Sequence, residues 1–178
     1  MADRAHPLSA QAGKAAECGA VALAPAPPLT RVAVRAGQQA AITLAGMLRV
    51  ALPTTPCRSN RTSERAALWL GPDEWLVLAE DGTALPTAHA GTSIVDVSHR
   101  DTALSVSGPR AAWAINAFCA LDLHPAAFPV GMCTRTVFGK AQIVLWRTGD
   151  DSFHIEVARS FAPYVWACLE EARREFLA

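Results

Sequence analysis

The stretch Ile94-Val-Asp-Val-Ser-His-Arg-Asp-Thr-Ala-Leu-Ser-Val-Ser-Gly108-Pro109 says more about the fold than any other part of the chain. Residues 94–97 predict a strand, which a short polar link joins to a second strand at 103–107. Apolar residues alternate with serines in the second strand, as expected when one face of a sheet is buried. Pro109 suits the first turn of a helix, because its missing N–H would have no partner there. A helix over about 109–119 is therefore predicted.

Further strands are predicted on both sides of this stretch. The turn Gly71-Pro72-Asp73-Glu74 separates apolar runs at 67–70 and 75–78, which predicts a hairpin because proline and aspartate favour tight turns. Apolar residues alternate with His154 and Glu156 near the C-terminus, a pattern typical of a sheet with one face in solvent. The other predicted strands are 41–44, 48–52, 134–138, 141–146 and 153–157.

A last helix is predicted after Ser160, which can cap it, with Pro163 in its first turn. Its apolar residues fall on one stripe, as in a helix packed on a core. They are Phe161, Tyr164, Val165, Cys168, Leu169, Ala172 and Phe176. The charged residues expected to face water are Glu170, Glu171, Arg173 and Arg174.

Segregated helices and hairpin-length connections predict an α+β fold, with antiparallel sheets and helices packed on one side. Residues 1–29 are rich in alanine and proline and have no periodic apolar stripe, so they are expected to form an N-terminal arm. This arm is either disordered or ordered only against another subunit. Residues 30–178 are expected to form a single domain.

Composition excludes several classes of function. The 178 residues hold 16 Lys and Arg against 16 Asp and Glu, so no polyanion such as nucleic acid is expected as a partner. No apolar run approaches the roughly 20 residues that span a bilayer, and no signal-peptide segment is recognised. We therefore expect a cytoplasmic protein that has no membrane partner. Hydrophobic residues reach 51% and charged ones only 18%, which suggests a protein partner.

Two groups of residues could in principle carry chemistry. Asp96, Ser98 and His99 contain the residue types of a nucleophilic triad, but neighbouring side chains of a strand point to opposite faces. We interpret Asp96 and Ser98 as bonding to local backbone, with His99 and Arg100 at the surface or an interface. Cys119, His124 and Cys133 could bind zinc by residue type, although their spacing is not that of a zinc knuckle.

The other residues that could bind a cofactor or react are predicted to have structural roles. No GxGxxG or GxxxxGK loop is present for a nucleotide cofactor. The five cysteines are widely and irregularly spaced, which favours reduced thiols. Three of the five tryptophans are expected to be buried in the chain itself. No residue is assigned as catalytic, cofactor-binding or metal-binding.

Several motifs in order resemble the gamma subunit of heterotetrameric sarcosine oxidase, over roughly residues 66–172. They are Trp69-Leu-Gly-Pro-Asp-Glu-Trp-Leu-Val-Leu78, Val95-Asp-Val-Ser-His-Arg100, Val106-Ser-Gly-Pro109, Leu121-Asp-Leu-His-Pro125, Phe128-Pro129, Thr136-Val-Phe-Gly-Lys140 and Ser160-Phe161. Ala120 departs from the family pattern, where a proline is expected. The family is in turn similar to the folate-binding domain of the glycine-cleavage T-protein, in which an Asp-Val-Ser-His strand precedes a Ser-Gly-Pro strand end and a helix.

The resemblance implies a non-catalytic structural and assembly subunit of a complex in sarcosine catabolism and one-carbon metabolism. That complex oxidatively demethylates sarcosine to glycine, forming hydrogen peroxide and 5,10-methylenetetrahydrofolate. The resemblance places FAD, FMN, NAD, tetrahydrofolate and zinc on the alpha, beta and delta subunits, and none on this chain. It also implies those three subunits as partners in a heterotetramer.

Two other functions stay open from the sequence. The first is a stand-alone folate-binding or one-carbon-transfer protein that uses the pocket of a T-protein-like fold. The second is a zinc protein built on Cys119, His124 and Cys133.

Overall fold

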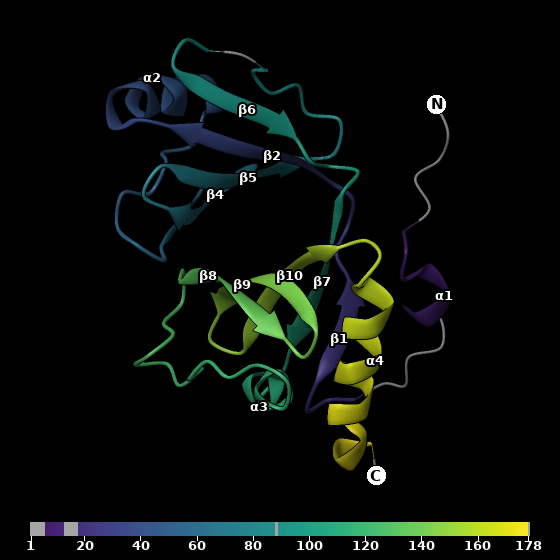
Figure 1. The fold of residues 1–178 in the computed structure, drawn as a ribbon. Helices are drawn as coiled ribbons and strands as arrows, with labels where there is room; N and C mark the ends of the chain where they lie inside the picture. Colours follow the sequence, from purple (N-terminus) through teal and green to yellow (C-terminus); the bar gives the residue numbers. More distant parts are fainter. Residues whose placement is uncertain (1–5, 13–17, 88, 178) are drawn as a thin grey trace. The chain divides into compact units, whose positions relative to one another are not determined.

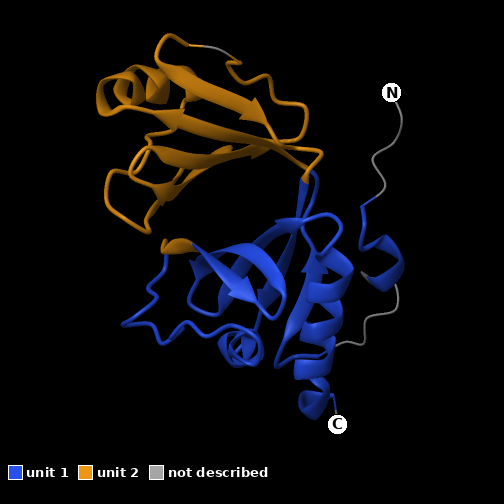
Figure 2. Cartoon of the chain, viewed as in Figure 1, with its two compact units in different colours: residues 1–28, 101–130, 135–178 blue, residues 29–100, 131–134 orange. Residues whose placement is uncertain are grey.

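The chain separates into two compact units (Figure 2). The computed structural model describes residues 6–12, 18–87 and 89–177. Unit 1 comprises residues 1–28, 101–130 and 135–178, and unit 2 comprises residues 29–100 and 131–134. The sequence of unit 2 is thus inserted into that of unit 1, and each unit contains one antiparallel sheet.

The sheet of unit 1 has five strands in the order β1-β7-β10-β9-β8 (Figure 1). They are β1 (Ala22–Pro25), β7 (Asp101–Ser107), β10 (Ser152–Ala158), β9 (Ala141–Gly149) and β8 (Cys133–Phe138). β7 is antiparallel to both of its neighbours, with Ser107 opposite Ala22 of β1 and also opposite Ser152 of β10. The strands predicted from the sequence in this region are confirmed.

β1 comes from the segment that the sequence predicts to be an N-terminal arm. Its four residues pair with β7, and the following Ala26 donates its N–H to the carbonyl of Ala103 at 3.0 Å. A short helix, α1 (Ser9–Ala12), precedes it. The arm over residues 1–29 and the single domain over residues 30–178 both stay predictions.

Alternation along β7 and β10 sorts their side chains onto two faces. Leu104 and Val106 are fully buried and lie opposite Ile155 and Phe153. The predicted solvent face of β10 is wrong, because Glu156 is only 2% exposed. Its carboxylate is held by the imidazole of His154 on the same face, at 2.7 Å from Oε1 to Nε2. A polar residue can be buried in this way when it has a charged or hydrogen-bonding partner.

The helix after Gly108-Pro109 is α3 (Ala111–Asn116), shorter than the predicted 109–119. It ends where the amide of Asn116 donates to the carbonyls of Cys119 and Leu121. These side-chain bonds satisfy carbonyls of a non-helical segment, so the helix does not need to continue.

The C-terminal helix α4 (Ala162–Ala172) is followed by a 3-10 turn, η1 (Arg174–Phe176). Val165 and Leu169 are buried as predicted. The prediction that Arg173 faces water is wrong, since it is 1% exposed. Its guanidinium binds both carboxylate oxygens of Glu170 at 2.9 Å and the carbonyl of Val21 at 3.1 Å. These bonds satisfy the buried charge and tie the helix to the segment before β1.

The sheet of unit 2 has five strands in the order β3-β4-β5-β2-β6. They are β3 (Ser59–Arg61), β4 (Arg65–Gly71), β5 (Glu74–Glu80), β2 (Leu29–Ala36) and β6 (Thr92–Asp96). The hairpin of β4 and β5 confirms the sequence prediction, with Trp69 opposite Trp75. β2 was not predicted, although Val32, Val34 and Ala36 alternate along it and are all buried.

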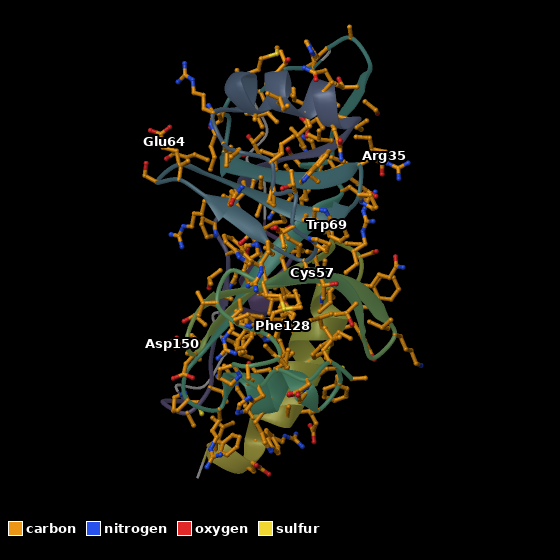
Figure 3. The ribbon with its side chains drawn as sticks, turned by 90° about the vertical axis from the view of Figure 1, so that its left-hand side faces the viewer. Arg35, Cys57, Glu64, Trp69, Phe128 and Asp150 are labelled. Atoms are coloured by element: carbon orange, nitrogen blue, oxygen red, sulfur yellow. The ribbon has the colours of Figure 1, made fainter. Side chains whose placement is uncertain are left out.

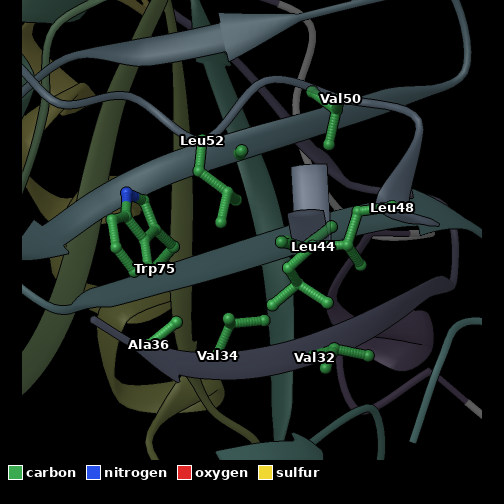
Figure 4. Close-up of a cluster of buried hydrophobic side chains, with 10 residues drawn as sticks. Val32, Val34, Ala36, Leu44, Leu48, Val50, Leu52 and Trp75 are labelled. Atoms are coloured by element: carbon green, nitrogen blue, oxygen red, sulfur yellow. The ribbon is translucent and has the colours of Figure 1, made fainter. Parts of the chain in front are cut away.

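The two strands predicted at 41–44 and 48–52 are wrong, because a helix, α2 (Gln38–Leu48), covers most of this span. Leu44 and Leu48 are four residues apart, so they share one helix face, and both are fully buried in the cluster of Figure 4. The β-branched residues that suggested a strand, Ile42 and Thr43, are exposed instead. Burial of the leucine pair has outweighed local strand propensity.

Two antiparallel sheets with a few helices confirm the predicted α+β class. Three tryptophans, Trp75, Trp146 and Trp166, are buried as expected. Among the described residues, no helix is both long enough and apolar enough to cross a membrane.

Gly108 should be the least replaceable glycine of unit 1. Its φ is +113°, and a Cβ there would lie 2.6 Å from the carbonyl oxygen of Ala20. Gly108→Ala should therefore combine backbone strain with a clash and destabilise the chain by about 2–4 kcal/mol. Urea unfolding followed by circular dichroism measures this.

Two matched variants separate strain from clash. Gly82 has φ +77° and open space where a methyl group would lie, so Gly82→Ala should cost only about 1 kcal/mol. Gly46 lies inside α2, and a Cβ there would meet nothing within 4 Å, so Gly46→Ala should stabilise by about 0.5–1 kcal/mol. Equal effects for Gly108→Ala and Gly82→Ala would show that the approach to Ala20 is unimportant.

Candidate functional site

Asp96 and Ser98 anchor the exit of β6 to β2 and do not form a nucleophilic site. The Asp96 carboxylate accepts the N–H of Ser98 at 2.8 Å. The Ser98 hydroxyl accepts the N–H of Arg31 at 2.8 Å and also lies 3.4 Å from the Arg31 carbonyl. His99 is exposed, as interpreted from the sequence. The predicted bonding to local backbone is confirmed for Asp96, whereas Ser98 bonds the backbone of Arg31, which is distant in the sequence.

The three residues considered for zinc each have a separate partner. The Cys119 sulfur lies 3.9 Å from the Thr136 hydroxyl, and His124 accepts a backbone N–H through Nδ1 at 3.3 Å. Cys133 donates its thiol hydrogen to the carbonyls of Arg58 at 3.3 Å and Trp69 at 3.6 Å. Within the described parts of the chain, no three His, Cys, Asp or Glu residues are grouped closely enough to hold a metal ion.

Cys133 is a neutral buried thiol. Its side chain is fully buried, and this loss of solvation raises the pKa of the Cys133 thiol from 9.0 to about 12. A backbone hydrogen bond at Trp69 opposes this rise in pKa to a smaller extent, and the nearby Cys57 raises the pKa slightly further. A thiol in this state is a poor metal ligand and a poor nucleophile, because both roles require the thiolate.

The face of β9 and β10 that carries Glu156 also holds His154 and Trp146. The His154 and Trp146 rings meet edge to face, with centroids 5.8 Å apart. The indole N–H of Trp146 is buried without a hydrogen-bond partner among the described residues. Sequence reasoning missed this group because the alternation of His154 and Glu156 with apolar residues predicts solvent on that face. Only the two-residue spacing of His154 and Glu156 signals that they could interact.

A buried cation, Arg147, organises the irregular link between α3 and β8. Its guanidinium donates to the carbonyls of Leu123 at 3.1 Å and Phe128 at 2.9 Å, and also to the carbonyl of Asp150. It lies over the ring of Phe153, 5.2 Å from the centroid. Phe128 and Asp150 are labelled in Figure 3. These contacts are to the chain's own backbone and core, so Arg147 has a structural role, which no local sequence pattern predicts.

An open groove of about 440 Å³ runs along α4 and η1. Its charged residues have ion-pair partners, since Arg174 binds Glu171 at 3.0 Å and Glu170 binds the buried Arg173, which does not line the groove. Because these charged groups are already engaged in ion pairs, the groove is poorly suited to bind a charged ligand. The lining residues are Gln11, Trp166, Ala167, Glu170, Glu171, Arg174 and Leu177.

Exposed apolar side chains are the clearest unexplained surface feature. α2 carries no charged residue along its 11 residues, yet Ile42 on it is 71% exposed and Met47 is 44% exposed. Apolar side chains exposed on an uncharged helix mark a surface suited to a protein partner. The others are Val95, Trp113, Val130, Val137, Phe161 and Leu177.

Comparisons with known proteins agree on one family. The family model described as sarcosine oxidase, gamma subunit family, matches residues 32–175. The sarcosine oxidase subunit gamma of an Arthrobacter species is 33% identical over 97% of this chain and 89% of its own length. The subunit of the same name from Corynebacterium sp. strain U-96 is 34% identical over 84% of this chain and 77% of its own length.

Solved structures agree in fold. A chain of the heterotetrameric sarcosine oxidase from Corynebacterium sp. U-96, in complex with pyrrole 2-carboxylate, matches with a TM-score of 0.90 and 31% identity. The match covers 98% of this chain and 97% of the other. The glycine cleavage system aminomethyltransferase T from Bartonella henselae matches with a TM-score of 0.64 and 12% identity, over 85% of this chain and 46% of its own. This second likeness confirms the predicted T-protein-like fold and nothing more.

Burial of the Cys133 thiol predicts a stability that falls at alkaline pH. The folded-state pKa of about 12 exceeds the ordinary value of 9.0, so the folded state binds the proton more tightly than the unfolded state. This contribution is complete below pH 9 and declines as pH rises from 9 toward 12, by up to about 1.4 kcal/mol per pH unit.

Urea unfolding between about pH 8 and 10.5, with reductant present, measures this decline. Cys133→Ala should show a shallower fall in unfolding free energy above pH 9 than the unaltered chain. Other titrating groups affect both proteins equally, so the difference between the two slopes reports Cys133. Identical slopes would contradict the assignment.

Proposed function

We propose, from the premise that this chain belongs to the sarcosine oxidase gamma subunit family, that it is a non-catalytic assembly subunit of a heterotetrameric sarcosine oxidase. The observation that carries the proposal is the match over nearly the whole of both chains to a heterotetrameric sarcosine oxidase, with a TM-score of 0.90. A fold preserved over its full length supports a preserved place in such a complex.

The reaction belongs to the proposed complex as a whole. We propose that it oxidatively demethylates sarcosine to glycine, with hydrogen peroxide and 5,10-methylenetetrahydrofolate as further products. In this proposal the alpha, beta and delta subunits hold FAD, FMN, NAD, tetrahydrofolate and zinc. The whole complex lies in the cytoplasm. The hydrogen bonds that engage Ser98 and the raised pKa of Cys133 support a structural role for this chain, because neither group is suited to act as a catalytic nucleophile.

The uncharged helix α2 supports a protein partner. We infer that its exposed apolar side chains, Ile42 and Met47, contact one of the larger subunits of the complex. Removing two exposed apolar side chains from water favours association, at roughly 25 cal/mol for each Å² buried. A charge introduced there would have to be desolvated without a partner.

Co-expression with alpha, beta and delta subunits tests the assembly role. The unaltered chain should co-purify with all three in equal amounts. The double variant Ile42→Glu with Met47→Glu should reduce its recovery in the complex at least tenfold, since two carboxylates would be buried unpaired. Its unfolding free energy should change by less than about 1 kcal/mol, because both side chains are exposed in this chain.

A matched control is Ala127→Glu, which adds a carboxylate at an exposed position of unit 1. It should co-purify normally. Normal recovery of the α2 double variant would remove α2 from the interface, and failure of the unaltered chain to co-purify would overturn the assembly role itself.

Titration with tetrahydrofolate separates the assembly role from a stand-alone folate-binding protein. Isothermal calorimetry on the isolated chain should give no saturable heat if the chain acts only in assembly. Saturable binding with a stoichiometry near one would favour the stand-alone function. Metal analysis of protein purified without chelators tests the zinc alternative in the same preparation.

A further inference from the structure

Two cysteines far apart in sequence lie opposite one another within unit 2. Arg58 and Met132 form an antiparallel bridge. On one side of it Ser59 donates its N–H to the carbonyl of Gly131 at 2.9 Å. On the other side Cys133 donates its N–H to the carbonyl of Cys57, also at 2.9 Å. The antiparallel pattern therefore makes Cys57 and Cys133 the next opposing pair.

This placement meets the spacing that a disulfide requires. Opposing residues of an antiparallel pair that share a hydrogen bond have Cα atoms about 5.5 Å apart. Disulfides join residues whose Cα atoms are about 4.4–6.8 Å apart. Cys57 is also close enough to Cys133 to act electrostatically on its thiol.

The two thiols differ in accessibility. Cys57 is half-buried and follows Pro56 in a loop, so solvent and small oxidants reach it. Cys133 is fully buried, with its thiol hydrogen directed to the carbonyls of Arg58 and Trp69. Figure 3 labels Cys57 and Trp69, whose segments are joined by the Trp69 N–H and the Arg58 carbonyl at 3.0 Å. An accessible thiol beside a protected one is the arrangement of an attacking and a resolving cysteine.

The backbone of Cys57 is an independent sign of function. Its φ is +58°, in the left-handed region that glycine and asparagine occupy most easily. A cysteine held there costs about 1 kcal/mol or more relative to glycine. Strained positions of this kind concentrate at functional sites.

We propose that Cys57 and Cys133 form a reversible intrachain disulfide when the protein meets hydrogen peroxide. The Cys57 thiolate attacks one peroxide oxygen, breaks the O–O bond, and gives a sulfenic acid and one water molecule once the departing hydroxide takes a proton. Cys133 is a poor nucleophile toward molecules in solution, but within the pair it is held opposite Cys57, so the second step is intramolecular. Its sulfur attacks the sulfenic sulfur, and its proton leaves with the hydroxyl group as a second water. Two thiols are oxidised by two electrons, and one peroxide is reduced to two waters.

The disulfide would join the short segment 131–134 covalently to the main body of unit 2. Burial of Cys133 keeps it protonated, so the accessible Cys57 reacts first. The pair does not depend on the proposed function, although a peroxide-forming oxidase would supply the oxidant beside this chain. Thiol reductants of the cell would reverse the bond.

Mass spectrometry on the full chain tests the pair. The reduced protein is exposed to a few equivalents of hydrogen peroxide, and its remaining thiols are alkylated under denaturing conditions. Two of the five cysteines should escape alkylation, with a loss of two hydrogen atoms in mass. Peptide mapping should find Cys57 linked to Cys133, and dithiothreitol should restore all five thiols.

Two variants control the assignment. Cys57→Ser should abolish the cross-link and leave Cys133 free to be alkylated. Cys168→Ser, at another half-buried cysteine, should leave it intact. Oxidation of Cys57 to sulfinic acid without a cross-link, or a cross-link between other cysteines, would overturn the proposal. Because mapping of the unaltered chain needs no substitution, a poorly folding variant would not obscure the result, and the assembly test is unaffected by either outcome.

Discussion

The pairing of β7 with strands from both ends of the chain is the constraint on which unit 1 depends. β7 lies between β1, near the N-terminus, and β10, near the C-terminus, and it is antiparallel to both. The close approach of Gly108 to the carbonyl of Ala20 allows the N-terminal segment to pass the end of β7. Arg173 also holds this segment, through the carbonyl of Val21. Segments from the first and last parts of the described chain are thereby fixed to one strand.

The sequence pattern predicted most strands of the two sheets correctly, but it predicted the wrong secondary structure for the segment between β2 and β4. The β4–β5 hairpin and the strands β7 to β10 follow from turn chemistry and from alternation with a period of two, both of which are local. α2 could not be predicted in the same way, because Ile42 and Thr43 favour a strand locally. What decides that segment is the burial of Leu44 and Leu48 against β2 and β5, which are distant contacts.

The burial of three charged residues could not be predicted from the local sequence for a similar reason. Arg147, Glu156 and Arg173 have the sequence character of surface charges, since charged residues are almost never buried without partners. Arg147 and Arg173 bind the carbonyls of Phe128 and Val21, which only the folded chain brings near them. The printed partner of Glu156 is the imidazole of His154, two residues away on the same strand face. The bond of the Asp96 carboxylate to the Ser98 N–H was predictable because it spans two residues, whereas the bond of the Ser98 hydroxyl to Arg31 was not. Motif order over roughly residues 66–172 identified the family, while none of these sites identified a reaction.

The insertion of unit 2 into unit 1 also affects how the protein is made. During translation β1 leaves the ribosome first, yet its partner β7 follows only after residues 29–100 have been synthesised. Unit 2, apart from its segment 131–134, can begin to fold in that interval, while β1 waits with its backbone hydrogen-bonding groups unpaired. The short length of β1 and Pro25 at its end limit the risk that the waiting strand pairs with another nascent polypeptide.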